Sequence, residues 1–300
     1  MDRKDSIDTF GAVSLIGIAI ILAVNQVVIK LGNQGVGPVF MAGLRSALAL
    51  VFLLIWMHLR GKRFSIEPGT VPAGLLLGLL FSIEFISLFL ALDLTTVART
   101  SILFYSMPVW LTLAAHFLLP GERMSGPKLA GLALAFAGVV VAILSRGGGD
   151  GGQASLLGDV FALVAALSWG AIALAARVLP IQRAIPEMQL FWQLAISAPV
   201  LILLAPLFGP LLREPALFHW GLLFYQALFV ASFGFLFWFN LLRIYPASSV
   251  ASFSFLTPVL GVFLGWSLLN EYVGPQTFVA LALVSVGIVL INRPATRRPR

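Results

Sequence analysis

Two charged side chains lie inside long apolar stretches of this sequence, where water is scarce. Glu84 stands in the middle of "LLFSIEFISLFL", and Arg45 lies within "MAGLRSALAL". An ionised carboxylate in such surroundings is costly unless it is paired or hydrated. We therefore expect Glu84 to face a polar cavity, where it would bind the amino group of a ligand or exchange a proton. The alternative is a structural role, as a partner of Arg45 or as a neutral hydrogen-bonding group.

Arg45 allows two interpretations. It lies one to two turns inside its apolar stretch, so its long side chain could snorkel to the nearer polar boundary. The sequence slightly favours this interpretation. In the other, the guanidinium binds the carboxylate of a ligand inside the cavity.

Amide side chains also interrupt apolar stretches. They can orient a polar ligand, and they can equally well bond a neighbouring helix at a modest gain in free energy. For any single one of them, the bond between helices is the favoured interpretation. These residues are Asn25, Gln26, Gln193, Gln226 and Asn240.

Several aromatic residues are candidates for contacting a ligand, because a flat π face binds aromatic or cationic groups without a dedicated hydrogen-bond partner. Trp169 is preferred, since Ser168 and Gly170 beside it would let a ligand approach the backbone. The chain has 24 phenylalanines, so most aromatic side chains must instead contact lipid or core. The other candidates are Phe104, Tyr105, Trp192 and Trp238.

Two prolines fall inside apolar stretches. Pro108 and Pro258 each remove a backbone donor, so the helices that contain them should kink at corresponding places. The sequence is consistent with hinges or gate corners, and equally with static kinks that shape the packing.

The composition of the chain indicates that these residues lie on transmembrane helices. Of 300 residues, 60% are hydrophobic and 10% are charged, which is too little charge to cover a soluble globule of this size. Lipid must be the solvent, and each crossing of roughly 30 Å of hydrocarbon needs roughly 20 apolar residues. The pattern predicts an all-α integral membrane protein with ten transmembrane helices, at about 10–31, 37–59, 70–92, 96–119, 127–145, 156–178, 187–209, 217–242, 247–269 and 275–292.

The basic residues predict the orientation. If the amino terminus is cytoplasmic, an even number of spans returns the carboxyl terminus to the same side. Most lysines and arginines then lie in inner loops, and outer loops receive only Lys30, Arg99, Arg146 and Arg213. This is the distribution that the positive-inside rule describes. The net charge of +7 thus belongs to short inner loops, and nucleic-acid binding is not expected.

The chain repeats itself. "LDLTTVARTSILFYSMPVW" from Leu92 resembles "LRIYPASSVASFSFLTPVL" from Leu242, so that Pro108 aligns with Pro258. An acidic residue and a Gly-Pro pair follow in both copies, with Glu122 in the first and Glu271 in the second. We expect two five-span halves, 1–148 and 149–300, joined near a glycine-rich stretch at 147–152. Because five is odd, the second half would be inverted, an arrangement that lets transporters open alternately to either side.

The sequence resembles the drug/metabolite transporter superfamily, in particular its ten-span EamA-type exporters, and most closely the bacterial aromatic amino-acid exporters. The resemblance covers nearly the whole chain and rests on "SILFYSMPVW" followed by "LLPGERMSGPKLAGLALAFAGVVV", on "ASFSFLTPVL" with "LLNEYVGPQTF", and on "LSWGAIALAAR". It implies a polar cavity lined by the first four spans of each half, with the fifth and tenth spans outside. Two departures are the absence from the first span of a counterpart to Trp169 and Gly170, and Gln193 in the place of Arg45.

The expected function is secondary transport, exporting aromatic and other neutral amino acids or similar small metabolites. The main alternative is a nucleotide-sugar or phosphorylated-metabolite antiporter of the same superfamily, which the scarcity of cations within spans disfavours. A channel or a scaffold also stays open. An enzyme is not expected, since P-loop, HExxH and GxSxG motifs are absent.

The expected partners are a small-molecule substrate and the lipid of a bacterial inner membrane. No cofactor or metal is expected, and the absence of cysteine excludes thiolate ligands. A monomer would suffice, and the sequence leaves the oligomeric state open.

Overall fold

A computed structural model describes Lys4 and residues 7–119, 125–145, 155–245, 250 and 253–292. Glu122, Arg146 and the glycine-rich stretch at 147–152 lie outside the described residues. The α-helices are α1 (Thr9–Gly35), α2 (Pro38–Leu59), α3 (Val71–Leu94), α4 (Val97–Phe104), α5 (Met107–Leu118), α6 (Gly126–Leu144), α7 (Leu156–Val178), α8 (Pro186–Leu204), α9 (Leu217–Tyr225), α10 (Phe235–Ile244), α12 (Leu256–Leu269) and α13 (Pro275–Asn292). Short 3-10 helices are η1 (Pro180–Arg183), η2 (Ala205–Phe208) and η4 (Phe253–Phe255), and the π-helical stretch η3 (Gln226–Gly234) joins α9 to α10.

The chain is a mostly helical, multi-pass membrane protein. Among the described residues, nine helical stretches are long and apolar enough to cross a membrane, and Phe253–Leu269 forms a shorter apolar helix. Two sequence expectations were wrong. Because α1 extends to Gly35, Lys30 lies within a helix and not in a loop, and Arg99 lies within α4.

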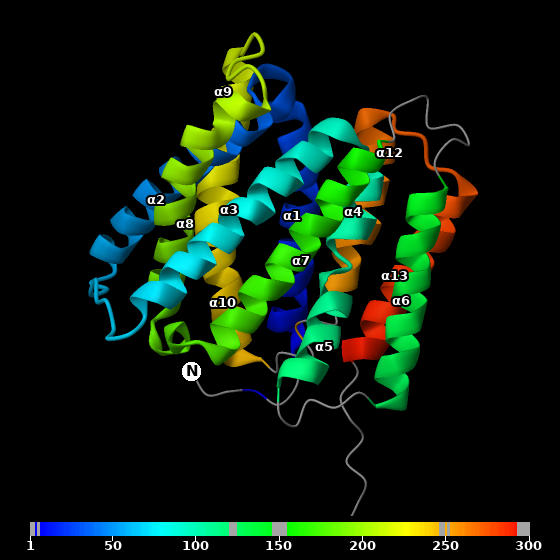
Figure 1. The fold of residues 1–300 in the computed structure, drawn as a ribbon, viewed down its shortest axis with the longest axis horizontal. Coiled ribbons are helices and arrows are strands. Elements are labelled where there is room, and N and C mark those ends of the chain that lie inside the picture. The colour runs from blue at the N-terminus through cyan, green and yellow to red at the C-terminus, as the bar shows by residue number, and fades with distance from the viewer. Residues whose placement is uncertain are drawn as a thin grey trace, which may run out of the picture.

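The helices run between two ends of the bundle. α1 begins at the lower end in Figure 1, which we call the amino-terminal end. The turns after α1 and α3 and the turn before α9 gather at the opposite end, which we call the far end.

The fourth apolar stretch is broken into two helices. α4 ends at Phe104 and α5 begins at Met107, so Pro108 lies in the first turn of α5. Pro258 is the third residue of α12 and follows the 3-10 turn η4. A first-turn proline has no intrahelical hydrogen bond to lose. The break therefore precedes each proline, and whether these breaks act as hinges stays a prediction.

The interior is formed by helices from distant parts of the chain. α3 packs along α7 and α8, α2 packs on α8, and α12 lies between α1 and α4. α6 and α13 pair with each other at one edge of the bundle (Figure 1). Glycines allow this close approach, since a Cβ atom on Gly131 would lie 2.8 Å from the carbonyl oxygen of Gly287.

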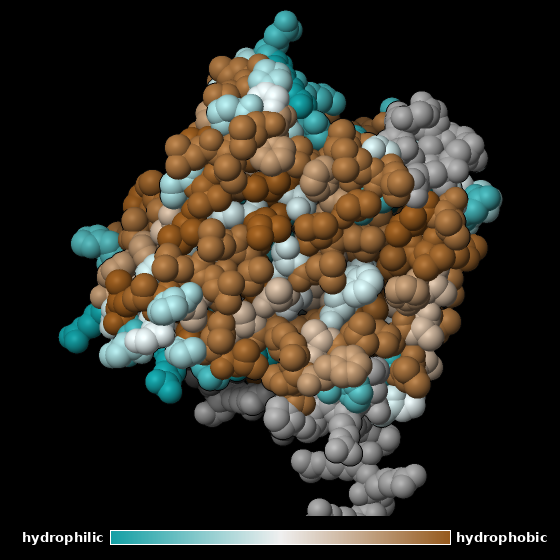
Figure 2. Space-filling view, viewed as in Figure 1, coloured by the Kyte–Doolittle hydropathy of each residue, from teal (hydrophilic) through white to brown (hydrophobic). Residues whose placement is uncertain are grey.

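The outer surface has the character of a lipid-facing surface. Figure 2 shows hydrophobic side chains across the middle of the visible face, with hydrophilic side chains gathered towards its ends. Large apolar side chains such as Leu76, Phe136 and Phe278 are exposed on three different helices. A monomeric soluble protein rarely exposes so much contiguous apolar area.

Candidate functional site

Arg45 does not snorkel. Its side chain is 1% exposed, and its guanidinium carbon lies 3.7 Å from the centroid of the Phe85 ring on α3. The rings of Phe81 and Phe89 lie 5.9 Å and 5.8 Å away. α2 turns this residue towards the interior, where three phenylalanines on one face of α3 receive the guanidinium. The favoured sequence interpretation was therefore wrong.

Glu84 is also buried, at 4% exposure, on the helix that carries these phenylalanines. Arg45 acts on it electrostatically, yet the two side chains form no direct ion pair. Nε and Nη2 of Arg45 have no hydrogen-bond partner among the described residues. The structure thus contradicts the close ion pair considered for these residues and leaves both charges available to a third group.

Two glutamines add uncharged polar groups. Both amide atoms of Gln26 and both of Gln226 lack a hydrogen-bond partner among the described residues, although both side chains are at most 1% exposed. Gln226 lies beside Gly32, where a Cβ atom would be 3.7 Å from its Nε2 atom. The Tyr105 hydroxyl lies near the Gln26 amide without the geometry of a hydrogen bond. A buried amide without a partner is costly, so these groups are suited to a polar ligand or to water.

By residue count along their helices, these residues lie at similar distances from the far end. Counting inward from the far end at 1.5 Å per residue, they lie about 10 to 15 Å deep on separate helical segments. We call this set the polar layer. It consists of Gln26, Arg45, Glu84, Tyr105 and Gln226.

Aromatic rings lie beside the polar layer. Trp169 of α7 stacks on Phe104 with 5.0 Å between centroids and 19° between planes. Its ring meets Tyr105 edge-on at 5.9 Å. Phe104 ends α4 and Tyr105 occupies the break before α5, so the broken helix presents both rings to α7. Trp169 is only partly buried, and its role in a pocket stays a prediction.

Asn25 shares some properties of the polar layer. It is buried beside Gln26 on α1, and its Oδ1 atom has no hydrogen-bond partner among the described residues.

Trp192 and Gln193 occupy a different place. Trp192 packs on α3, where a Cβ atom on Gly74 would lie 2.4 Å from its ring. Gln193 donates to the carbonyl of Gln189 on its own helix at 3.3 Å. Both residues lie in the first turns of α8, nearer the amino-terminal end, so the structure separates them from the polar layer.

Trp238 and Asn240 are also separate from it. Trp238 packs against a cluster that includes Leu15, Ile18 and Leu241. Asn240 is exposed near the end of α10. Both residues lie on α10, and their sequence positions did not show which of its neighbours they would face.

A dense set of polar contacts fastens the far end. The Lys30 ammonium donates to the carbonyls of Leu92 and Thr95, at 3.1 Å and 2.6 Å. Arg213 forms two bonds with the Asp93 carboxylate, at 2.7 Å and 3.1 Å. These contacts join α1, the end of α3 and the segment before α9.

A buried ion pair, which sequence analysis missed, lies between α4 and α7. Arg99 donates to both carboxylate oxygens of Asp159, at 3.1 Å and 2.7 Å, and the carboxylate is fully buried. The available signal was an aspartate in the first turn of an apolar span.

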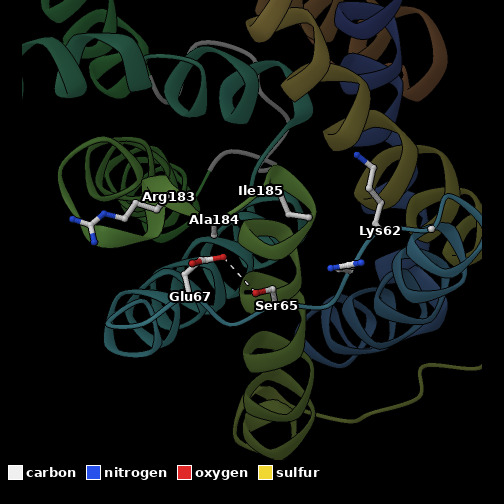
Figure 3. Close-up of a pocket in the computed structure, with 8 residues that line it drawn as sticks. Lys62, Ser65, Glu67, Arg183, Ala184 and Ile185 are labelled. Atoms are coloured by element: carbon white, nitrogen blue, oxygen red, sulfur yellow. Dashed lines mark hydrogen bonds between the residues drawn. The ribbon is translucent and has the colours of Figure 1, made fainter.

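A surface hollow of about 270 Å³ lies at the amino-terminal end, between the α2–α3 loop and η1. Its basic side chains do not converge. Lys62 and Arg183 lie on opposite sides and point apart, with Ser65 and Glu67 between them, 3.4 Å apart (Figure 3). Lys62 is paired with Glu187 at 3.2 Å. This hollow is therefore a poor site for an anion.

The arrangement of the polar layer suits recognition of a small molecule. A small molecule that carries one positive and one negative charge could bind here. The available groups are one cation, one carboxylate, two amides, a phenol and stacked aromatic rings. Among the described residues, no group of three or more histidine, aspartate or glutamate side chains could hold a metal ion.

Comparisons with known proteins show the family of this chain, two similar proteins and a shared fold. The model of the EamA-like transporter family matches residues 9–144 and 156–293. An uncharacterised transporter of Bacillus subtilis (strain 168), YoaV, is 26% identical over 287 residues, covering 95% of this chain and 97% of the relative. A probable amino-acid metabolite efflux pump of Escherichia coli (strain K12) is 29% identical over 301 residues, covering 97% and 95%. A solved crystal structure at 22% identity aligns with a TM-score of 0.65 over 93% of this chain and 96% of the other, which shows the shared fold.

Proposed function

Because this chain belongs to the EamA-like transporter family, we propose that it exports neutral amino acids, aromatic ones among them, or similar small metabolites across a bacterial inner membrane. The proposal adds a substrate class and a direction to the family's general function. The relative from Escherichia coli described as a probable amino-acid metabolite efflux pump supports this choice.

The main support for this proposal is that Arg45 and Glu84 of the polar layer are both buried and form no ion pair with each other. An amino acid presents a carboxylate and an ammonium group on one carbon atom. Arg45 offers free guanidinium edges to the first, and Glu84 offers an acceptor to the second. The rings of Phe104, Tyr105 and Trp169 provide a flat apolar surface for the substrate side chain.

A phosphorylated substrate fits less well. A nucleotide sugar would need several free cations, because each phosphate carries negative charge. Two cations of the described residues are already engaged. The partly buried Lys30 donates to backbone carbonyls, and the buried Arg99 pairs with Asp159. Arg45 remains as the cation of the polar layer.

We propose alternating access through two inverted five-span halves, 1–148 and 149–300. The packing supports it, since α1 lies against α12 and its counterpart by repeat, α7, lies against α4 and α5. The two stretches matched by the family model begin and end close to these halves. The breaks before Pro108 and Pro258 occupy matching places and are candidate hinges.

Both termini are proposed to be cytoplasmic, so that the far end faces outward. The burial of Arg99 and the partial burial of Lys30 strengthen the charge argument, because fewer basic residues then remain in outer loops. One copy contains the whole polar layer, so a monomer should suffice.

Ligand-dependent thermal stability tests the substrate class. The purified protein would be heated with phenylalanine, tryptophan, threonine or methionine, and separately with a nucleotide sugar or a sugar phosphate. A ligand that binds the folded state raises the unfolding temperature, and the rise grows with the logarithm of the ligand concentration above its Kd. Stabilisation by amino acids alone supports the proposal, and stabilisation by phosphorylated compounds alone would replace it.

A further inference from the structure

Glu271 joins two distant parts of the chain at the far end. It lies in the turn between α12 and α13 and is 2% exposed. One carboxylate oxygen accepts the N–H of Val97 at 2.7 Å, and the other accepts the N–H of Ala98 at 3.0 Å. These are the first two residues of α4, so the carboxylate caps that helix from the opposite half of the sequence.

The turn is built to hold this carboxylate in place. Asn270 adopts a left-handed conformation with φ of 53°, which reverses the chain directly after α12. The N–H of Glu271 donates to the carbonyl of Gly265 at 3.1 Å. A Cβ atom on Gly265 would lie 2.4 Å from Oε2 of Glu271, so only glycine leaves room for the side chain.

The capped helix leads to the proposed site. α4 contains eight residues and carries Phe104 at its last position, with Tyr105 directly after it. The helix is also held by the pair formed by Arg99 and Asp159 of α7. A displacement at the start of so short a helix would therefore move both aromatic rings relative to Trp169.

The surroundings of Glu271 are dry. Burial raises the pKa of its carboxyl group, while the N–H groups of Ala98 and Val97 and the charge of Lys30 oppose that shift. A carboxylate kept in such a place depends on both of its hydrogen bonds.

We propose that Glu271 is a positioning residue: it holds α4, with Phe104 and Tyr105, against α12 while the far end is closed, and it releases α4 when that end opens. This inference rests on the proposed alternating-access transport. In the variant Glu271→Gln, the amide side chain could accept only one of the two N–H groups and would turn its own NH2 group towards the other.

The test measures the conformation of the far end directly. The chain contains no cysteine, so spin labels can be attached at Leu217→Cys on α9 and Ser267→Cys on α12, both exposed. Distances between the labels in lipid nanodiscs would be compared with and without Glu271→Gln. We expect the variant to raise the ratio of the longer to the shorter distance population about tenfold, as one unsatisfied buried donor would.

A second variant changes a donor of the hydrogen bonds that Glu271 accepts. Val97→Pro removes the N–H that Oε1 accepts, at the first helical position, where proline is favoured. Val97→Pro should give the same longer-distance population as Glu271→Gln. The double variant, which carries both changes, should enlarge this population little beyond either single variant. Restoring the charge on a shorter side chain, in Glu271→Asp, should return part of the wild-type distribution. Glu67→Gln, an exposed carboxylate at the amino-terminal end, is the matched control and should change nothing.

Unchanged label distances in both Glu271→Gln and Val97→Pro would overturn the proposal. Circular dichroism and elution volume would confirm that each variant is folded. Because the measurement needs no substrate, its failure would leave the proposed substrate class untouched.

Discussion

The guanidinium of Arg45 lies over the ring of Phe85, with 3.7 Å between the guanidinium carbon and the ring centroid. The aromatic face covers the flat side of the cation and offsets part of the cost of burying it. The edges of the guanidinium point elsewhere, and Nε and Nη2 have no hydrogen-bond partner among the described residues. An arginine arranged in this way can still bind a carboxylate through two parallel hydrogen bonds.

Arg45→Lys should weaken substrate binding while the protein still folds. The ammonium keeps the charge but loses the planar stacking and the two-pronged geometry, so we expect KM to rise about tenfold. Arg60→Lys is the matched control, because Arg60 lies over Trp56 at 5.1 Å but is exposed. Initial rates of uptake into liposomes measure both. Equal KM values for wild type and Arg45→Lys would remove Arg45 from the site.

Glu84→Gln should remove the pH dependence of transport. The buried carboxylate lies on α3 without an ion pair, so it is the group of the polar layer that can exchange a proton. The amide has nearly the same size and cannot titrate. Uptake would be measured from pH 5.5 to pH 8.5, chosen to span neutrality, with Glu67→Gln as the control. A pH profile that Glu84→Gln leaves unaltered would exclude a role for this carboxylate in coupling.

Gly74→Ala should destabilise the protein. A Cβ atom there would lie 2.4 Å from the Trp192 ring, so α3 and α8 would have to separate. Such overpacking typically costs about 1 to 3 kcal/mol. Gly17→Ala is the control, since nothing lies within 4 Å of the added atom, and alanine should stabilise α1 slightly. Thermal unfolding in detergent measures both, and a Gly74→Ala protein as stable as the wild type would contradict the packing.

Much of the fold follows from hydropathy alone. Long apolar runs with breaker residues between them predict spans, and α13 occupies the predicted 275–292. The sequence predicted one kinked span at 96–119 and not two helices that meet at Tyr105. A proline marks a disturbed region but does not fix which residue leaves the helix. The π-helical stretch η3 was also missed, since no local residue pattern requires it.

The site was predictable only in part. Charges inside apolar runs identified Glu84 and Arg45, since lipid makes such residues expensive. Sequence could not show which helix faces meet, because the spans are apolar on all sides and give little periodicity. Trp192 docking on Gly74 and the exposure of Asn240 are both consequences of packing between helices.

Asp159→Asn should cost far more stability than Asp93→Asn. The first change removes a fully buried carboxylate from the guanidinium of Arg99, and losing one partner of a buried ion pair costs about 3 to 5 kcal/mol. Asp93 pairs with Arg213 where both side chains are partly exposed, so its loss should cost about 1 kcal/mol or less. Chemical unfolding of both variants would reveal the difference. Similar losses would mean that the pair between α4 and α7 is not a main fastening.

Counterflow in liposomes would show directly whether the protein carries neutral amino acids across a bilayer. Vesicles containing the purified protein would be loaded with unlabelled phenylalanine and diluted into a trace of labelled phenylalanine. We expect transient accumulation of label above the level in empty vesicles, abolished when the internal load is omitted and reduced in Arg45→Lys. Label that never exceeds the level in empty vesicles, for phenylalanine and for the other neutral amino acids alike, with folded protein in the membrane, would contradict amino-acid transport by this protein.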